Sequence, residues 1–123
     1  MANSFRDLIV WQRAIQLTVA VYKLTARFPE SEKFGLTNQL RRACVSIASN
    51  IAEGYGKSSK GEYLLFLGHA RGSCAEVETQ LIIAKELGFG SSAAIPSVQS
   101  LSDEVSKMTV SLMKALRAVK TTR

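Results

Sequence analysis

Hydrophobic residues recur along the chain at steps of three and four positions, a spacing that places them on one side of a helix. The pattern predicts four helices, over about residues 4–27, 34–53, 60–87 and 97–119. The connections are short, and no segment alternates polar and apolar residues as a half-buried strand does. We therefore expect an all-α fold, an up-down-up-down antiparallel four-helix bundle that forms one domain over residues 1–123.

Polar and glycine residues near the predicted boundaries indicate where the helices begin and end. Asn3 or Ser4 is placed to cap the first helix. Ser31 and Ser97 are placed to cap the second and the fourth. The second helix is expected to stop at Gly54, Tyr55 and Gly56, because glycine permits the left-handed conformation common at helix ends. The fourth helix is expected to bury one stripe, made of Val98, Leu101, Val105, Met108, Leu112, Ala115 or Leu116, and Val119.

The first helix carries two neighbouring apolar lines. One consists of Val10, Ala14, Leu17, Val21, Leu24 and Phe28, and the other of Leu8, Trp11, Ile15, Val19 and Tyr22. A stripe this wide exceeds what one core-facing side needs. We expect contacts on two sides of this helix, either deep in the bundle or shared with another subunit.

Charge and composition narrow the class of protein. The 123 residues carry a net charge of +6 and a pI near 9.6, which favours polyanionic partners. No signal peptide or membrane span is evident, so we expect a cytoplasmic protein without membrane contact. Cys44 and Cys74 fall within apolar helical patterns, which predicts buried and reduced thiols.

Polar side chains form a seam along the second and third predicted helices. Its members are Arg42, Ser46, Asn50 and Glu53 on one helix, and His69, Ser73, Glu76 and Gln80 on the other. Because the helices are antiparallel, donors can face acceptors, and we interpret the seam as a hydrogen-bonded network with Arg42 and Glu76 as the leading ion pair. The network can lie within one subunit or between subunits, and the alternative is that the two stripes are solvated faces.

The same seam contains the residues with most catalytic potential. The one histidine, His69, shares a helix side with Ser73 and Glu76. Side chains four and seven positions apart project in parallel from successive turns, whereas a nucleophile and its base must converge. Two cysteines and one histidine do not supply a zinc set, and the paired Glu-x-x-His motifs of a di-iron bundle are absent. We expect no enzyme and no metal or cofactor.

Basic residues outside the seam suggest nucleic-acid binding. The candidates are Arg41, Lys57, Lys60, Lys107, Lys114, Arg117, Lys120 and Arg123. Contacts from such side chains to phosphates add up in a salt-dependent way. The alternative is that lysines near a helix C-terminus complement the helix dipole and keep the protein soluble.

A family resemblance rests mainly on residues 39–54, which read QLRRACVSIASNIAEG. Supporting positions are Leu8, Val10, Trp11, Ala14, Phe28, Pro29, Glu32, Gly35, Ala70, Gly72, Ser73 and Glu76. This segment resembles the signature of bacterial four-helix-bundle proteins known as ribosomal RNA intervening-sequence proteins. The family is similar to the accessory protein of diversity-generating retroelements, a barrel-shaped homopentamer that binds nucleic acid and a reverse transcriptase.

The resemblance implies self-association, with a homopentamer as the expected assembly. Together with the charge, it leads us to expect a non-enzymatic helical bundle that binds RNA or DNA through basic surfaces without strong sequence specificity. The alternative is a protein-interaction scaffold or accessory subunit with no direct nucleic-acid binding.

Overall fold

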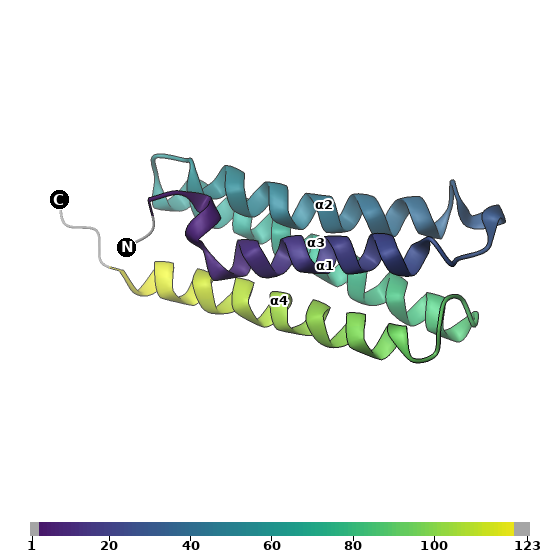
Figure 1. Cartoon of the computed structure of the whole chain (residues 1–123). Helices are drawn as coiled ribbons and strands as arrows, with labels where there is room; N and C mark the ends of the chain where they lie inside the picture. The colour runs from purple at the N-terminus through teal and green to yellow at the C-terminus, as the bar shows by residue number, and fades with distance from the viewer. Residues whose placement is uncertain (1–2, 120–123) are drawn as a thin grey trace.

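Four α-helices form the body of the protein in this computed structural model, which describes residues 3–119 (Figure 1). They are α1 (Ile9–Thr25), α2 (Leu36–Tyr55), α3 (Lys60–Glu86) and α4 (Ala94–Ala118). Two short 3-10 helices, η1 (Phe5–Asp7) and η2 (Glu30–Glu32), precede α1 and α2. Residues 3–119 contain no strand, so the prediction of an all-helical fold is confirmed over this range.

The helices lie side by side, and each contacts two neighbours. α1 packs against α2 and α4, and α3 packs against the same two helices from the opposite corner. The start of α1, the α2–α3 connection and the end of α4 lie at one end of the bundle, and the other two connections lie at the opposite end (Figure 1). Segments far apart in the sequence therefore meet at the two ends.

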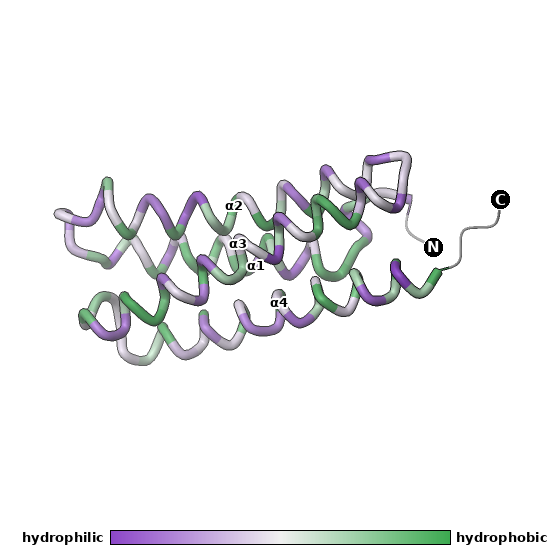
Figure 2. The backbone as a smooth tube through the Cα atoms, turned by 180° about the vertical axis from the view of Figure 1, so that it is seen from behind, coloured by the Kyte–Doolittle hydropathy of each residue, from purple (hydrophilic) through white to green (hydrophobic). Residues whose placement is uncertain are grey.

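One core runs between the four helices. Hydrophobic and hydrophilic positions alternate along the helices, as expected where one side of each is buried (Figure 2). The largest fully buried side chains are Leu17, Val21, Leu40, Cys44, Ile47, Ile51, Leu67, Cys74, Val77, Leu81, Val105 and Thr109. Every helix contributes to this set, and Cys44 and Cys74 lie in it as free thiols.

The two apolar lines of α1 have different environments. The line from Val10 to Phe28 is buried against the other helices. In the second line, Ile15, Val19 and Tyr22 remain 38 to 48% exposed. Leu8 and Trp11 of this line pack against the core, and the Arg41 guanidinium stacks on the Tyr22 ring. Residues 3–119 therefore make the second contact expected for this helix only in part.

The N-terminal segment departs from the prediction of one continuous helix capped at Asn3 or Ser4, because α1 begins only at Ile9. The Ser4 Oγ accepts the Arg6 N–H at 3.1 Å and caps η1, and Leu8 is extended before α1 begins. The Phe5 ring packs edge-on against Trp11, with ring centroids 5.2 Å apart. This aromatic contact holds the segment against α1, whereas in a continuous helix the two rings would project from different sides.

Another acceptor replaces the predicted cap at the start of α2. The Glu32 carboxylate, and not Ser31, accepts the Leu36 N–H, at 3.0 Å. A carboxylate at this position also interacts favourably with the helix dipole. The helix therefore begins one turn after η2, with its first amide already bonded.

α2 ends at Tyr55 with Gly56 as its C-cap, within the predicted stretch, but Gly54 itself lies inside the helix and neither glycine is left-handed. The positive-φ residues of the described chain are Gly88 and Gly90, so Gly54 has ordinary helical geometry. A Cβ added to Gly54 would lie 3.0 Å from the Phe66 Cβ and 3.2 Å from the Tyr63 carbonyl oxygen. The glycine is needed because α3 passes too close for a side chain.

The fourth helix begins earlier than predicted. Ser91 accepts the Ala93 N–H at 3.1 Å through its Oγ and the Ala94 N–H through its carbonyl, which leaves Ser97 inside α4. The buried stripe also differs, because Ser102 and Thr109 are buried while Leu101, Met108 and Leu112 pack at its edge. The Thr109 hydroxyl is accommodated because it donates to the Val105 carbonyl at 2.8 Å.

Candidate nucleic-acid interface and polar seam

Basic side chains from two segments lie at the end of the bundle where α1 starts and α4 ends (Figure 1). Lys57 and Lys60 lie at the α2–α3 connection, and Lys60 Nζ donates a hydrogen bond to the Val119 carbonyl at 2.6 Å. Lys114 and Arg117 lie exposed in the last turns of α4. The contact joins residues 59 positions apart. We call Lys57, Lys60, Lys114 and Arg117 the basic end.

Three acidic residues share this end of the molecule, and one of them is Asp7 of η1, just before α1. Glu62 is engaged at the start of α3, where its carboxylate accepts the Ser59 hydroxyl at 3.2 Å while the Ser59 Oγ accepts the Glu62 N–H at 3.1 Å. Glu53 lies exposed near the end of α2. With Arg6 of η1 added to the basic end, this end has five cations and three carboxylates, so it keeps a positive balance.

The remaining basic candidates do not join this group. Arg41 connects α2 to α1, donating from Nε to the Thr25 hydroxyl at 2.9 Å and stacking over the Tyr22 ring at 4.5 Å. Lys107 pairs with Asp103 one turn away on α4, at 3.0 Å. Lys120 and Arg123 lie outside the described residues.

Aromatic rings lie beside the basic end, and the sequence reasoning did not single them out. Tyr55 and Tyr63 pack edge to face with centroids 6.1 Å apart, and burial, together with the neighbouring Tyr55, raises the pKa of Tyr63. Lys57 Nζ lies 5.0 Å from the Phe66 ring centroid, and Phe66 in turn contacts His69. Tyr63, Phe66 and His69 are spaced three residues apart, which places them on one side of α3. This spacing is the sequence signal that could have predicted the aromatic group.

Part of the predicted polar seam forms between α2 and α3. The Ser73 hydroxyl donates to the Ser46 hydroxyl at 2.9 Å, and Asn50 Nδ2 donates to the Ser46 Oγ and carbonyl at 3.0 and 2.8 Å. Glu53 and His69 lie exposed, outside this cluster. The hydrogen-bonded cluster therefore consists of Ser46, Asn50 and Ser73, in the middle of the α2–α3 pair.

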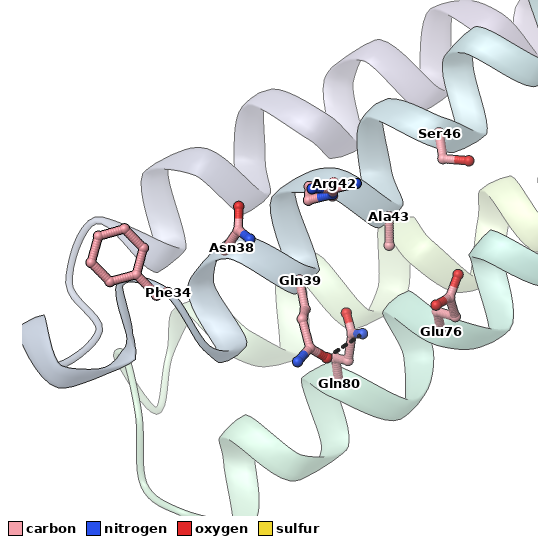
Figure 3. Close-up of a pocket in the computed structure, with 8 residues that line it drawn as sticks. All are labelled: Phe34, Asn38, Gln39, Arg42, Ala43, Ser46, Glu76 and Gln80. Carbon is pink, nitrogen blue, oxygen red and sulfur yellow. Dashed lines mark hydrogen bonds between the residues drawn. The ribbon is translucent and has the colours of Figure 1, made fainter.

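Arg42 and Glu76 do not form the expected ion pair. Among residues 3–119 the ion pairs are Arg13–Glu104 and Asp103–Lys107. Instead, Arg42 and Glu76 line a groove of about 540 Å³ between α2 and α3, together with Phe34, Asn38, Gln39, Ala43, Ser46 and Gln80 (Figure 3). Arg42 lies on the outer surface of α2, so its guanidinium is available to groups outside the chain.

Gln80 is the least satisfied polar residue of the groove. Its Nε2 donates to the Gln39 Oε1 over a long 3.4 Å, as Figure 3 shows, while its Oε1 is buried and has no hydrogen-bond partner. The Gln80 side chain is only 9% exposed. Buried amides normally find partners for both ends, so the Gln80 Oε1 is left to a donor other than residues 3–119, such as a water molecule in the groove.

The Ser73, His69 and Glu76 side chains do not converge on a catalytic arrangement. The Ser73 hydroxyl donates to Ser46, and His69 packs edge-on against Phe66 with centroids 5.8 Å apart. Residues 3–119 also contain no cluster of three or more His, Cys, Asp or Glu side chains able to hold a metal ion.

Both thiols are protonated and therefore unreactive at neutral pH. Burial raises the pKa of Cys44 to about 12, with a further contribution from the neighbouring Cys74. Burial likewise raises the pKa of Cys74 to about 11. Because the thiolate is the nucleophile and the metal ligand, protonated thiols in the core act as packing groups.

Comparison with known proteins decides the family. The family model described as 23S rRNA-intervening sequence protein matches residues 6–111. The chain belongs to this family. No curated protein sequence matches the chain significantly. The matched range includes α1, α2, α3 and most of α4, so family membership rests on nearly the whole bundle.

A crystal structure with the same fold is known within the S23 ribosomal protein family. It is a protein of unknown function from Bacteroides thetaiotaomicron, 23% identical to this chain, with a TM-score of 0.77. The similarity covers 86% of this chain and 99% of that one. At this identity the likeness extends to the fold alone. None of the described helices has an apolar stretch long enough to cross a membrane.

Proposed function

We propose that the protein is a non-enzymatic, self-assembling helical bundle that binds RNA or DNA through the basic end. The observation that carries the proposal is the hydrogen bond from Lys60 to the Val119 carbonyl. This bond holds the α2–α3 connection against the end of α4. The basic residues of both segments therefore lie at the same end of the bundle. Lys and Arg contacts to phosphates supply most of the sequence-independent affinity for nucleic acids.

The arrangement favours binding without strong sequence preference. Lys57 lies in the α2–α3 connection and Lys60 begins α3, while Lys114 and Arg117 come from the last turns of α4. These long cationic side chains reach phosphates, whereas sequence is read by groups that approach base edges in a groove. The family name refers to an intervening sequence of 23S rRNA, which makes ribosomal RNA the first probe to use.

Self-assembly would multiply the charge of the basic end. The exposed line of Ile15, Val19 and Tyr22 supports an association surface on α1, and Phe34, which is 86% exposed, adds a large apolar side chain at the groove between α2 and α3. The family resemblance suggests a homopentamer. A ring of this kind repeats each phosphate-binding region around its circumference, which raises both the affinity and its salt dependence.

A binding role suits the chemistry of the side chains better than catalysis. The Ser73 hydroxyl is engaged by Ser46, and the raised pKa values of Cys44 and Cys74 keep both thiols protonated at neutral pH. Two free cysteines in the core also fit a reducing compartment, and we propose the cytoplasm.

Fluorescence anisotropy with a labelled 23S rRNA fragment and with random-sequence DNA of equal length tests the proposal. We expect both probes to bind, with affinity falling steeply between about 50 and 200 mM salt. Absence of binding to either probe at the lower salt concentration would refute nucleic-acid binding. That result would favour the alternative of a protein-interaction scaffold, for which the exposed line on α1 provides a surface.

A further inference from the structure

Two aromatic side chains on the surface of α3 lie outside the hydrophobic core. Tyr63, one turn before Phe66, packs against the core, whereas Phe66 lies outside the core cluster and is only partly buried. His69 is exposed one turn further along α3. Aromatic rings carry a large apolar area, and its burial is the usual reason for their presence in a fold. The core does not account for Phe66 and His69, which we call the ring pair.

The two rings of the ring pair are in contact and nearly perpendicular. Their centroids lie 5.8 Å apart, and their planes meet at 77°. Close packing against α2 fixes the base of the Phe66 side chain, since a Cβ added to Gly54 would lie 3.0 Å from the Phe66 Cβ. A flat group that stacks on one ring therefore meets the other edge to face, and both geometries are favourable between aromatic systems.

The ring pair adjoins a cation of the basic end. Lys57 Nζ lies 5.0 Å from the Phe66 ring centroid. The Glu62 carboxylate, one turn before Phe66 on α3, accepts a hydrogen bond from the Ser59 hydroxyl at 3.2 Å. A strand whose phosphate is bound by Lys57 therefore has its neighbouring bases within reach of Phe66 and His69.

Nucleic-acid bases have flat faces that can stack on such rings, and unpaired bases expose these faces most. Within a duplex the neighbouring base pairs cover each face, whereas bases of a single strand can be splayed apart and stacked on aromatic side chains. Proteins that bind single strands without sequence preference combine a cationic surface for the backbone with aromatic rings for the bases. The basic end and the ring pair together contain both parts.

We propose that the ring pair stacks on unpaired bases, so that the basic end binds single-stranded RNA or DNA in preference to duplex. The assignment rests on the proposed function, because the basic end must bind the phosphates. Charge alone favours a duplex, since a duplex carries two phosphate strands. A preference for the single strand therefore comes from the bases, and it needs no particular sequence because every base has a π-face.

Substitutions at the two ring positions separate stacking from other roles. His69→Gln removes the imidazole ring but keeps a polar side chain, and His69→Phe is the matched control that restores a ring without its nitrogens. Both should fold, because His69 is exposed. Phe66→Leu removes the second ring and keeps an apolar side chain beside Gly54. Circular dichroism and sedimentation check that the helix content and assembly of each variant match those of the wild type.

Fluorescence anisotropy compares three labelled probes at one salt concentration. They are an oligothymidylate of about 12 nucleotides, the same strand annealed to oligoadenylate, and an abasic strand with the same number of phosphates. We expect wild type and His69→Phe to bind the oligothymidylate at least about fivefold more tightly than the abasic strand, and more tightly than the duplex. His69→Gln and Phe66→Leu should lose about this factor for the oligothymidylate and keep the wild-type affinity for the other two probes.

The outcomes separate this inference from the proposed function. Equal wild-type affinities for the oligothymidylate and the abasic strand would refute base stacking while leaving phosphate binding intact. Equal affinities of His69→Gln and His69→Phe for the oligothymidylate would refute stacking on the His69 ring. Tighter binding of the duplex by the wild type would overturn the preference for single strands. Absence of binding to all three probes at low salt would refute the proposed function itself.

Discussion

Ser73 of α3 donates a hydrogen bond to the Ser46 hydroxyl of α2 at 2.9 Å, and Ser46 also accepts from Asn50. This cluster lies in the middle of the helix pair that Gly54 brings into close approach at one end. Small hydroxyls and a glycine thus set the register of α2 against α3, with no ion pair between Arg42 and Glu76 in the described chain.

Removing the Ser73 hydroxyl should weaken this helix pair. Ser73→Ala deletes a buried donor while Ser46 keeps its bond from Asn50, so we expect a loss of about 1 kcal/mol in the free energy of unfolding. Chemical denaturation measures it. Thr79→Ala is the control, because that exposed hydroxyl bonds only to its own helix at Ala75, and an equal loss in both variants would contradict the role of Ser73.

Gly54 and Gly61 should respond oppositely to alanine. A Cβ at Gly54 would press on the Phe66 Cβ and on the Tyr63 carbonyl, neither of which can rotate away, so Gly54→Ala should destabilise the protein by about 1–3 kcal/mol. A Cβ at Gly61 meets nothing within 4 Å, so Gly61→Ala should stabilise by up to about 1 kcal/mol through helix propensity. Thermal melting of both variants gives the sign of each change in stability. A higher Tm for Gly54→Ala would show that α2 and α3 are not in close contact there.

The buried thiols should make stability fall in alkaline solution. Their pKa values are about 12 for Cys44 and about 11 for Cys74, against an ordinary 9.0. As pH rises above 9.0 the unfolded chain releases thiol protons that the folded chain retains, so the free energy of unfolding declines until the pH reaches the folded pKa values, about 11 for Cys74 and about 12 for Cys44. Denaturation curves at several pH values should show a shallower decline in the Cys44→Ala/Cys74→Ala variant, and parallel declines would contradict the raised pKa values.

Arg41 should matter for stability and not for nucleic-acid affinity. Its guanidinium bonds to the Thr25 hydroxyl and the Tyr22 carbonyl, so Arg41→Gln should lower the free energy of unfolding by about 1 kcal/mol. Anisotropy with the RNA probe should give an unchanged dissociation constant. A weaker RNA complex with unchanged stability would place Arg41 in the interface instead.

The sequence allowed the number and approximate extent of the helices to be predicted, because the apolar spacing persists over many turns in each. Gly54 shows where such reasoning fails. A glycine near the end of a helical pattern can be a terminator or a site of close approach, and the choice depends on α3, which is remote in the chain. The prediction that Ser97 caps the fourth helix was wrong for a similar reason. Ser91 and the backbone turn before Ala94 supply the first hydrogen bonds of α4.

The candidate site was predictable to a smaller extent. Arg41 and Arg42 are adjacent in sequence, yet their directions differ by about 100° around the helix. Arg41 therefore contacts α1, while Arg42 lies on the outer surface of α2 beside the groove. Lys57 and Lys60 could be recognised as basic, but their position beside the end of α4 emerges only from the topology.

The salt dependence of RNA binding tests the role of the basic end most directly. The variant Lys57→Gln/Lys60→Gln/Lys114→Gln/Arg117→Gln removes its four charges, and Lys107→Gln removes an exposed lysine already paired with Asp103. We predict that the slope of log K against log salt flattens by roughly 0.7 for each lost contact to single-stranded RNA, while the Lys107→Gln control keeps the wild-type slope. Equal slopes for all three proteins, with assembly intact, would contradict the basic end as the phosphate-binding surface.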